Sequence, residues 1–169
     1  MQDKGMMLRY ALSTDGPAIT LLEPALATFD RFRQLSPRAK EAGGQLFARF
    51  EGADTILLEA ASPSFLDRRS RNGFSPNRWM QQREIRSRHA HGLHFVGDWH
   101  THPEPVPRPS HDDIYSMIDC FGHSLHDLRA FVLIIAGTKP APEGLYVAII
   151  DRNSAQQLVL VNATESISV

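Results

Sequence analysis

Residues 97–113 read GDWHTHPEPVPRPSHDD, a stretch that predicts a strand end, an irregular loop and a helix start in succession. The apolar and aromatic side chains at its beginning and just before it predict a strand over residues 93–100. Four prolines between residues 103 and 109 exclude regular structure there, because proline lacks a backbone donor and has a fixed φ. Ser110 then has the character of a helix N-cap. The stretch therefore turns the chain back from a strand end to a helix start.

The helix that begins at Ser110 is expected to run to about Phe121 and to end at Gly122. Ser110 and Asp113 have the spacing of a capping box, in which each side chain binds the backbone N–H of the other residue. Asp112 points about 100° away from Asp113 on such a helix. Asp113 is therefore the aspartate expected to face the preceding strand.

The remaining elements predict an α+β fold with a mixed, largely antiparallel, curved sheet flanked by helices. A helix is expected from Pro24 to Leu35, because proline suits a first turn and Ser36-Pro37 breaks the pattern. A hairpin is expected where the turn EGAD (51–54) joins two strands. The further strands are expected at 18–22, 45–50, 55–60, 129–136, 146–151 and 157–161. We expect a single domain over residues 1–169.

Composition and charge exclude several classes of protein. The 169 residues are 42% hydrophobic and 22% charged, with a formal net charge of −1, which suggests no nucleic-acid or membrane partner. The longest strongly apolar run, AFVLIIAG at 130–137, is too short to span a bilayer. The lone Cys120 cannot form an internal disulfide and is expected to be a small buried residue. These observations favour the cytoplasm.

Residues 62–91 differ from their surroundings, because they contain seven of the 18 basic residues of the chain, all arginines. Turn-forming residues dominate the first half, and Asn77 is expected to cap a helix running to about Arg88. We interpret the segment as an insertion between strands of the one domain. Its arginines are either a solvated charged face or part of a binding surface.

His100 and His102 are expected on one face of the predicted strand, because side chains alternate with a period of two. Two neighbouring imidazoles are compatible when they are neutral and share a cation. Zinc accepts imidazole and carboxylate ligands, and catalytic zinc usually has three protein ligands and a water. Asp113 is the best candidate for the third ligand. His89-x-His91 is not expected to bind metal, because it lies among arginines without a suitable carboxylate.

Ordinary structure explains the His-x-His pair and the capping box equally well when each is taken alone. Together they form the pattern His-x-His, seven residues, Ser, two residues, Asp, and Glu41 lies upstream beside a glycine pair in KEAGGQLF. This combination resembles the JAB1/MPN/Mov34 (JAMM) family of zinc-dependent isopeptidases and peptidases. The resemblance extends from the helix at Pro24 to the strand at Tyr146 and implies the JAB/MPN fold.

Carried over by position, the resemblance implies that His100, His102 and Asp113 ligate Zn²⁺. Glu41 would hold the water that zinc activates, take its proton and later pass it to the leaving amine. Ser110 would donate a hydrogen bond to the oxyanion of the tetrahedral intermediate. Zinc lowers the pKa of a bound water from 15.7 toward about 7, so a carboxylate suffices as the base.

The flanking residues Gly97, Asp98, Trp99, Pro103 and Glu104 give a closer resemblance to bacterial JAB proteins of CBASS antiphage operons. Members of that group are deconjugases that remove a CD-NTase, a cyclic-oligonucleotide synthase, which an E1/E2-like protein has attached through its C-terminus. A peptidase that matures a small ubiquitin-like or sulfur-carrier protein, and a non-catalytic MPN scaffold, are the alternatives.

The insertion ahead of the metal-binding strand helps JAMM isopeptidases to grip the extended tail that enters the cleft. Residues 62–91 occupy the equivalent place, so the resemblance implies a role in binding a protein C-terminal tail. Arg68, Arg69 and Arg71 are the residues expected to steer an acidic tail or partner.

Overall fold

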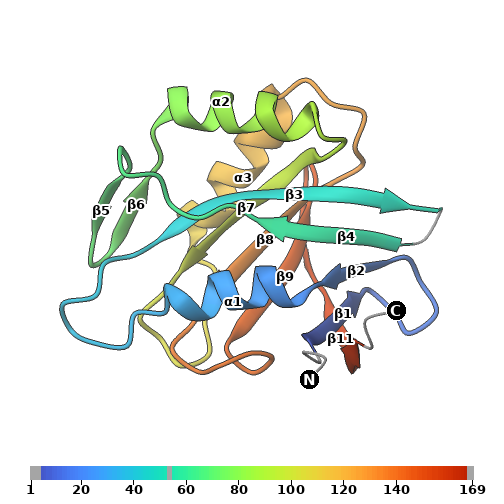
Figure 1. Cartoon of the computed structure of the whole chain (residues 1–169), viewed down its shortest axis with the longest axis horizontal. Helices are drawn as coiled ribbons and strands as arrows, with labels where there is room; N and C mark the ends of the chain where they lie inside the picture. The colour runs from blue at the N-terminus through green and yellow to red at the C-terminus, as the bar shows by residue number, and fades with distance from the viewer. Residues whose placement is uncertain (1–4, 53–54, 167–169) are drawn as a thin grey trace.

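The computed structural model describes residues 5–52 and 55–166, which form a nine-stranded sheet, a separate two-stranded sheet and three helices (Figure 1). The strands of the large sheet run in the order β10-β9-β8-β7-β3-β4-β2-β1-β11. Only the β2–β4 and β7–β8 pairs among its neighbours are parallel. In chain order the elements are β1 (Gly5–Ala11), β2 (Ala18–Leu21), α1 (Glu23–Arg31), β3 (Gly43–Glu51), β4 (Thr55–Ala60), β5 (Arg68–Ser70), β6 (Gly73–Ser75), α2 (Arg78–His89), β7 (His94–Thr101), α3 (His111–His123), β8 (Phe131–Ala136), β9 (Leu145–Ile150), β10 (Ala155–Gln157) and β11 (Val159–Ser166).

The sheet is strongly curved, as its two edges demonstrate. β10 pairs with β9 at one edge, and β11 pairs with β1 at the other, although only Leu158 separates β10 from β11. The two edges must therefore lie close together. Leu158 is buried, and its N–H donates to the carbonyl of Val147 in β9 at 2.9 Å. The predicted fold class, α+β with a mixed, largely antiparallel curved sheet and flanking helices, is confirmed.

The core lies on both faces of the sheet. Helix α1 covers one face, where Phe29 packs against Trp99 of β7 with ring centroids 5.2 Å apart. Helix α3 covers the other face, where Met117 and Phe121 pack against strand β8. All six residues of β8 are buried, as expected for a strand with a helix on each side.

Gly97 allows β7 to approach β8 closely. The β3–β7 register shifts between Leu46 and Phe47, and Gly97 lies opposite with a φ of 148°. A Cβ at Gly97 would collide with the backbone carbonyl of Val132. After this irregularity Trp99 faces α1, and His100 faces the other side of the sheet, toward α3. The glycine therefore sets which β7 side chains face the α3 side.

Two predicted helix ends are wrong. Helix α1 ends at Arg31 rather than Leu35, because Gln34 turns inward and binds the carbonyl of Arg71 at 2.8 Å. Helix α3 continues through Gly122 to His123. Both the N–H and the hydroxyl of Ser124 bind the carbonyl of Cys120, so the helix ends without a glycine in the left-handed region.

The strand predictions are mostly confirmed, with small shifts at the ends. The β3–β4 hairpin pairs as expected, although residues 53 and 54 of its EGAD turn lie outside the described residues. The strand predicted at 157–161 is two strands, β10 and β11. Strand β1 was not predicted, although its alternation buries Leu8 and Tyr10.

Residues 62–91 form the β5–β6 hairpin and helix α2, outside the nine-stranded sheet. The predicted helix cap is confirmed, since the Asn77 side chain accepts from the N–H of Met80. The hairpin was not predicted. The extent of one domain over residues 1–169 stays a prediction. None of the helices in the described part of the chain is long and apolar enough to cross a membrane.

Candidate metal centre

The end of β7 brings two imidazoles together. His100 is in β7, and His102 follows it, with its N–H donating to the carbonyl of Ala136 in β8 at 2.9 Å. Their Nε2 atoms are 3.1 Å apart. Thr101, between them, points to the opposite side and is completely buried. The alternation of a strand therefore places both histidines on one face, as predicted.

The N-terminus of α3 supplies the carboxylate. Ser110 and Asp113 form the predicted capping box, with the N–H of Ser110 donating to Asp113 Oδ2 at 2.6 Å and the N–H of Asp113 donating to Ser110 Oγ at 3.1 Å. Asp113 Oδ1 lies 3.2 Å from His100 Nε2, and Oδ2 lies 3.4 Å from His102 Nε2. The helix cap thus fixes the carboxylate that faces both imidazoles.

These three side chains have the spacing of a zinc site. Ligand bonds of about 2.0–2.1 Å at tetrahedral angles place neighbouring ligand atoms about 3.3 Å apart. The two Nε2 atoms are 3.1 Å apart, and each lies 3.2–3.4 Å from an oxygen of the Asp113 carboxylate, Oδ1 for His100 and Oδ2 for His102. Within residues 5–52 and 55–166, this is the one group of three or more His, Cys, Asp or Glu side chains close enough to hold a metal ion. Two imidazoles and a carboxylate therefore form a donor set that fits zinc.

The charges of these groups are strongly coupled. Burial alone would raise the pKa of Asp113, but hydrogen bonds from His100 and His102 hold it well below its usual range. Burial alone would lower the pKa of His102, but the Asp113 carboxylate and then Glu41 raise it overall. A carboxylate that stays ionised over a wide pH range is suited to holding a cation.

Glu41 lies beside these ligands on the segment that precedes β3. Strand β3 pairs with β7, with Gly43 opposite His100, and the N–H of Thr101 donates to the carbonyl of Ala42 at 2.8 Å. Burial raises the pKa of Glu41, while the nearby His100 and His102 oppose that shift. A carboxyl group with a raised pKa holds a proton more readily, as a general base requires.

A cavity of about 210 Å³ connects the site to the space between the helices. Glu41, His100 and Asp113 line one part of it, and Phe74 of β6 and Met117 of α3 line another. The candidate base and ligands therefore face a common space.

Ser110 is exposed at the rim of the ligand cluster. Its Oγ accepts a hydrogen bond from Asp113, so the hydroxyl proton remains available to donate elsewhere. The capping function and a donor function are compatible in this geometry.

The three arginines predicted to bind substrate differ in their surroundings. Arg68 is exposed, as expected of a steering residue. Arg69 instead donates from Nε to the carbonyl of Glu41 at 2.8 Å, and Arg71 donates from Nη1 to the carbonyl of Pro37 at 2.6 Å. The latter two side chains thus bind the segment that carries Glu41.

Asp98 is a further polar residue of this cavity. Its place in the sequence pointed only to the resemblance to bacterial JAB proteins and not to a role in the site. It lies two residues before His100 on β7 and lines the same cavity. Its Oδ1 is buried and has no hydrogen-bond partner among the described residues. Burial raises the pKa of this carboxyl to about 7. The period of two from His100 to Asp98 was the signal that could have identified it.

The other candidates examined in the sequence lie outside the cluster. His89 and His91 do not belong to a group of three or more possible metal ligands among the described residues. Cys120 is half-buried against the α3 core, and burial raises the pKa of its thiol, which disfavours a nucleophilic thiolate.

The chain is similar to known proteins of one family. The family model for prokaryotic homologs of the JAB domain matches residues 27–149. A protein of Escherichia coli (strain TW11681) named "CD-NTase/cGAS isopeptidase" is 26% identical over 103 residues, which cover 59% of this chain and 66% of that protein. A Pseudomonas aeruginosa protein (strain BWHPSA011 / Pa011) of the same name is 32% identical over 97 residues, covering 54% of this chain and 61% of that protein. The matches thus span just under two thirds of each relative.

The fold also has a solved counterpart. The solution structure of protein DSY2949 from Desulfitobacterium hafniense superimposes with a TM-score of 0.58 at 24% identity, covering 82% of this chain and 88% of that one. At this identity the likeness concerns the fold alone.

Proposed function

Because this chain belongs to the family of prokaryotic homologs of the JAB domain, we propose that it is a zinc-dependent isopeptidase of the JAMM type that cuts the bond after a protein C-terminus. The observation that carries the proposal is the convergence of His100, His102 and Asp113, whose possible ligand atoms all lie within 4.8 Å of one another. The proximity of Glu41 to these side chains supports a hydrolytic site rather than a structural zinc site.

His100, His102 and Asp113 would hold the zinc ion. Bound there, zinc would supply a Lewis acid that polarises the scissile carbonyl and lowers the pKa of water from 15.7 toward about 7. Glu41 would take the proton of the attacking water and pass it to the leaving amine. Glu41 lines the same cavity as His100 and Asp113, a position from which its carboxyl group could accept and return this proton.

Ser110 would stabilise the developing oxyanion. Its Oγ is fixed by the N–H of Asp113, so the hydroxyl can donate without losing its position. Removal of such a donor typically costs on the order of 3–4 kcal/mol of transition-state stabilisation. The capping box therefore holds the oxyanion donor and the third ligand in one unit.

We propose a CD-NTase as the protein whose C-terminal bond is cut, by analogy with the relatives named "CD-NTase/cGAS isopeptidase". The conjugate would be one made by an E1/E2-like protein, in antiphage defence, and a ubiquitin-like protein is the alternative substrate. An extended tail would enter the cleft past the β5–β6 hairpin, as a peptide can pair with an exposed strand edge. The exposed Arg68 would steer an acidic tail toward it.

The test uses a CD-NTase fused through its C-terminus to a reporter protein. We expect cleavage after the CD-NTase with added Zn²⁺, none with a chelator, and a loss of about 10³-fold or more in Glu41→Ala with zinc still bound. Asp119→Asn, at an exposed position of the same helix outside the cavity, serves as the control and should cleave normally. Zinc binding without cleavage of any C-terminal fusion would instead favour a non-catalytic scaffold. Cleavage of a ubiquitin-like or sulfur-carrier precursor alone would favour the maturing peptidase.

A further inference from the structure

The β5–β6 hairpin binds both backbone polar groups of Glu41. The N–H of Glu41 donates to the carbonyl of Ser70 at 2.7 Å. The carbonyl of Glu41 accepts from Arg69 Nε at 2.8 Å, and a second guanidinium nitrogen of Arg69 reaches the carbonyl of Lys40 at 3.4 Å. Residues 40–41 belong to no helix or strand, so these contacts provide the order that regular structure would otherwise supply.

The side-chain contacts come from one face of the hairpin. Arg69 and Phe74 are cross-strand partners, and the Phe74 ring occupies the space next to Gly43, where a Cβ would lie 2.7 Å from it. The Arg69 guanidinium also lies over the ring of Phe32, 5.7 Å from its centroid. Arg68, the next residue along β5, is exposed. Arg69 therefore faces the segment that carries the base rather than the solvent.

A buried polar network holds the other side of the same segment. The hydroxyl of Thr101 accepts from the N–H of Ala42 at 2.9 Å and donates to Gln34 Oε1 at 3.1 Å. Gln34 Nε2 in turn donates to the carbonyl of Arg71 at 2.8 Å. Thr101 and Gln34 are 0% and 3% exposed. The network thus ties the hairpin to the strand end that carries the two histidines.

We propose that Arg69 is a positioning residue for Glu41, which it holds in register with the metal ligands through the backbone carbonyl. The inference rests on the proposed function and deepens it. It separates the arginines of the hairpin into Arg68, which faces outward, and Arg69, which acts through Glu41. It also explains why the insertion contributes to the active site before any substrate arrives, since one hairpin both lines the cleft and orders the base.

A steering role of the Arg69 charge and a positioning role of its guanidinium group predict different effects of a lysine substitution. A steering role needs only a positive charge, which lysine also provides. The positioning role needs donors that reach two neighbouring carbonyls, and the single ammonium of lysine does not reproduce that geometry. Arg69→Lys therefore distinguishes the two roles, and it is also less disruptive to folding than Arg69→Ala.

The kinetic test uses the CD-NTase fusion with Arg69→Lys, Arg69→Ala and Arg152→Ala, an arginine on the exposed β9–β10 turn. We expect both Arg69 variants to lose about 10–100-fold in kcat with KM within about twofold, because misplacement of a catalytic group by about 1 Å has such an effect. Zinc binding by all three variants should match the wild type, and so should the kinetics of Arg152→Ala. A wild-type kcat in Arg69→Lys, or a change confined to KM, would overturn the proposal.

A second measurement does not depend on activity. Backbone hydrogen exchange of residues 38–44 in the metal-free protein should be at least about tenfold faster in both Arg69 variants, while exchange in β8 is unchanged. Arg68→Ala should leave the exchange of residues 38–44 as in the wild type. Unchanged exchange in Arg69→Ala would refute the positioning role. If the wild type cleaves no fusion, the proposed function fails, and the exchange experiment still decides whether Arg69 orders this segment.

Discussion

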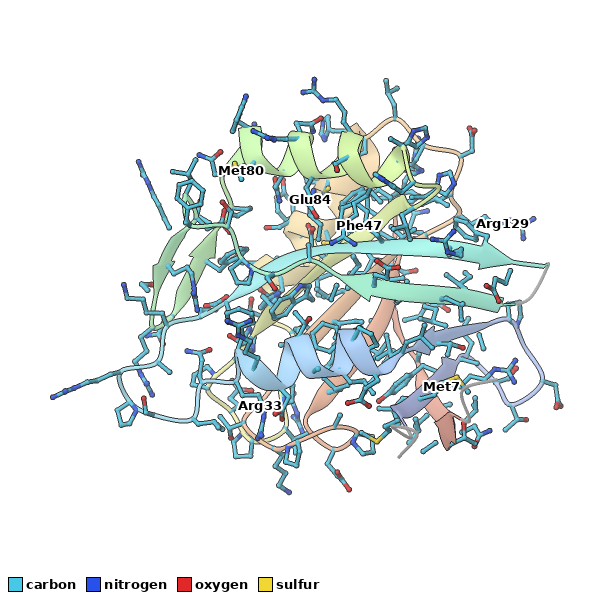
Figure 2. The ribbon with its side chains drawn as sticks, viewed as in Figure 1. Met7, Arg33, Phe47, Met80, Glu84 and Arg129 are labelled. Carbon is cyan, nitrogen blue, oxygen red and sulfur yellow. The ribbon has the colours of Figure 1, made fainter. Side chains whose placement is uncertain are left out.

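Helices α2 and α3 lie on the same side of the sheet but are held by different forces. Helix α3 buries Met117 and Phe121 against β8 and begins with a complete capping box. Helix α2 has no buried residue. Its attachments are polar or peripheral: Arg88 pairs with Glu59 of β4 at 2.7 Å, and the partly buried Ile85 packs against the small cluster that contains Phe47. Figure 2 shows Glu84 and Phe47 in the space between α2 and β3.

The difference indicates that the α3 side and the α2 side of the cleft differ in rigidity. The wall that carries Asp113 is part of the apolar core, so the ligand geometry is as rigid as the fold. The wall formed by α2 has few apolar contacts, and such segments open locally at a lower free-energy cost than the core. A firmly held candidate metal centre beside a lightly held helix is consistent with the proposed entry of an extended tail.

The largest effect is expected at Asp113, the α3 residue that faces both histidines. Asp113→Asn removes the charged ligand and should weaken zinc binding by at least about a hundredfold, with activity falling in parallel. Isothermal titration with Zn²⁺ measures the first effect, and cleavage of the CD-NTase fusion measures the second. Asp112→Asn, one residue away and exposed, is the matched control. Equal zinc affinities of the two variants would contradict the ligand assignment.

The second comparison concerns apolar burial by the two helices. Phe121→Ala in α3 leaves a cavity beside Phe131, whose ring centroid is 5.0 Å away, and should cost about 3–5 kcal/mol in the free energy of unfolding. Trp79→Ala in α2 removes a side chain that is 60% exposed and should cost less than about 0.5 kcal/mol. Urea denaturation of both variants tests this contrast. Similar losses would show that α2 is packed more firmly than its contacts indicate.

Asp98 of β7 is expected to make the free energy of unfolding depend on pH. Burial raises its pKa from 3.8 to about 7, so the folded state binds the proton more tightly than the unfolded state. The contribution of Asp98 to the free energy of unfolding is therefore fully present below pH 3.8 and is lost as the pH rises through about 7. The full shift corresponds to about 4 kcal/mol. We expect roughly 1–3 kcal/mol, because part of the side chain reaches the cavity.

Asp98→Asn removes the buried charge and keeps the shape. The metal-free variant should therefore be more stable than the wild type at pH 8 and no more stable at pH 4. Thermal or urea unfolding across that range provides the measurement. A gain that does not vary with pH would assign the effect to packing rather than to charge.

The smallest effect is expected at Arg88, which connects α2 to β4. Its side chain is 29% exposed and its partner Glu59 is 42% exposed, so solvent screens the pair. Arg88→Ala should cost about 0.5–1 kcal/mol, and the loss should shrink in 1 M NaCl. Arg83→Ala, which removes only a contact with the Trp79 ring, is the control on the same helix. A loss of several kcal/mol would mean that α2 depends on this pair alone.

Local sequence signals predicted the elements around the metal centre well. The capping box at Ser110 and the period of two at His100 and His102 depend on short-range geometry, and the structure has both. Predictions of helix ends were poorer. The ends predicted at Leu35 and Gly122 were wrong. Gln34, which binds the carbonyl of Arg71, decides the end of α1, and Ser124, which binds a carbonyl in the last turn, decides the end of α3.

The arginine-rich segment shows the opposite case. Its composition indicated an insertion with a possible binding surface, and nothing in its sequence separates Arg68 from Arg69. The β5–β6 pairing places Arg69 opposite Phe74, and the hydrogen bond from Arg69 to the Glu41 carbonyl joins residues 28 positions apart in the chain. The substrate-binding roles of Arg68, Arg69 and Arg71 stay predictions.

The sequence by itself determined which atoms are available for the metal centre and on which face of their own element each one lies. Strand alternation and helix capping are local properties, so two histidines, a serine and an aspartate within residues 100–113 were enough. The tertiary structure alone decided how Glu41 is held beside them and that Asp98 is left buried without a partner. Both depend on hydrogen bonds and burial between segments far apart in the chain, and no local pattern encodes those contacts.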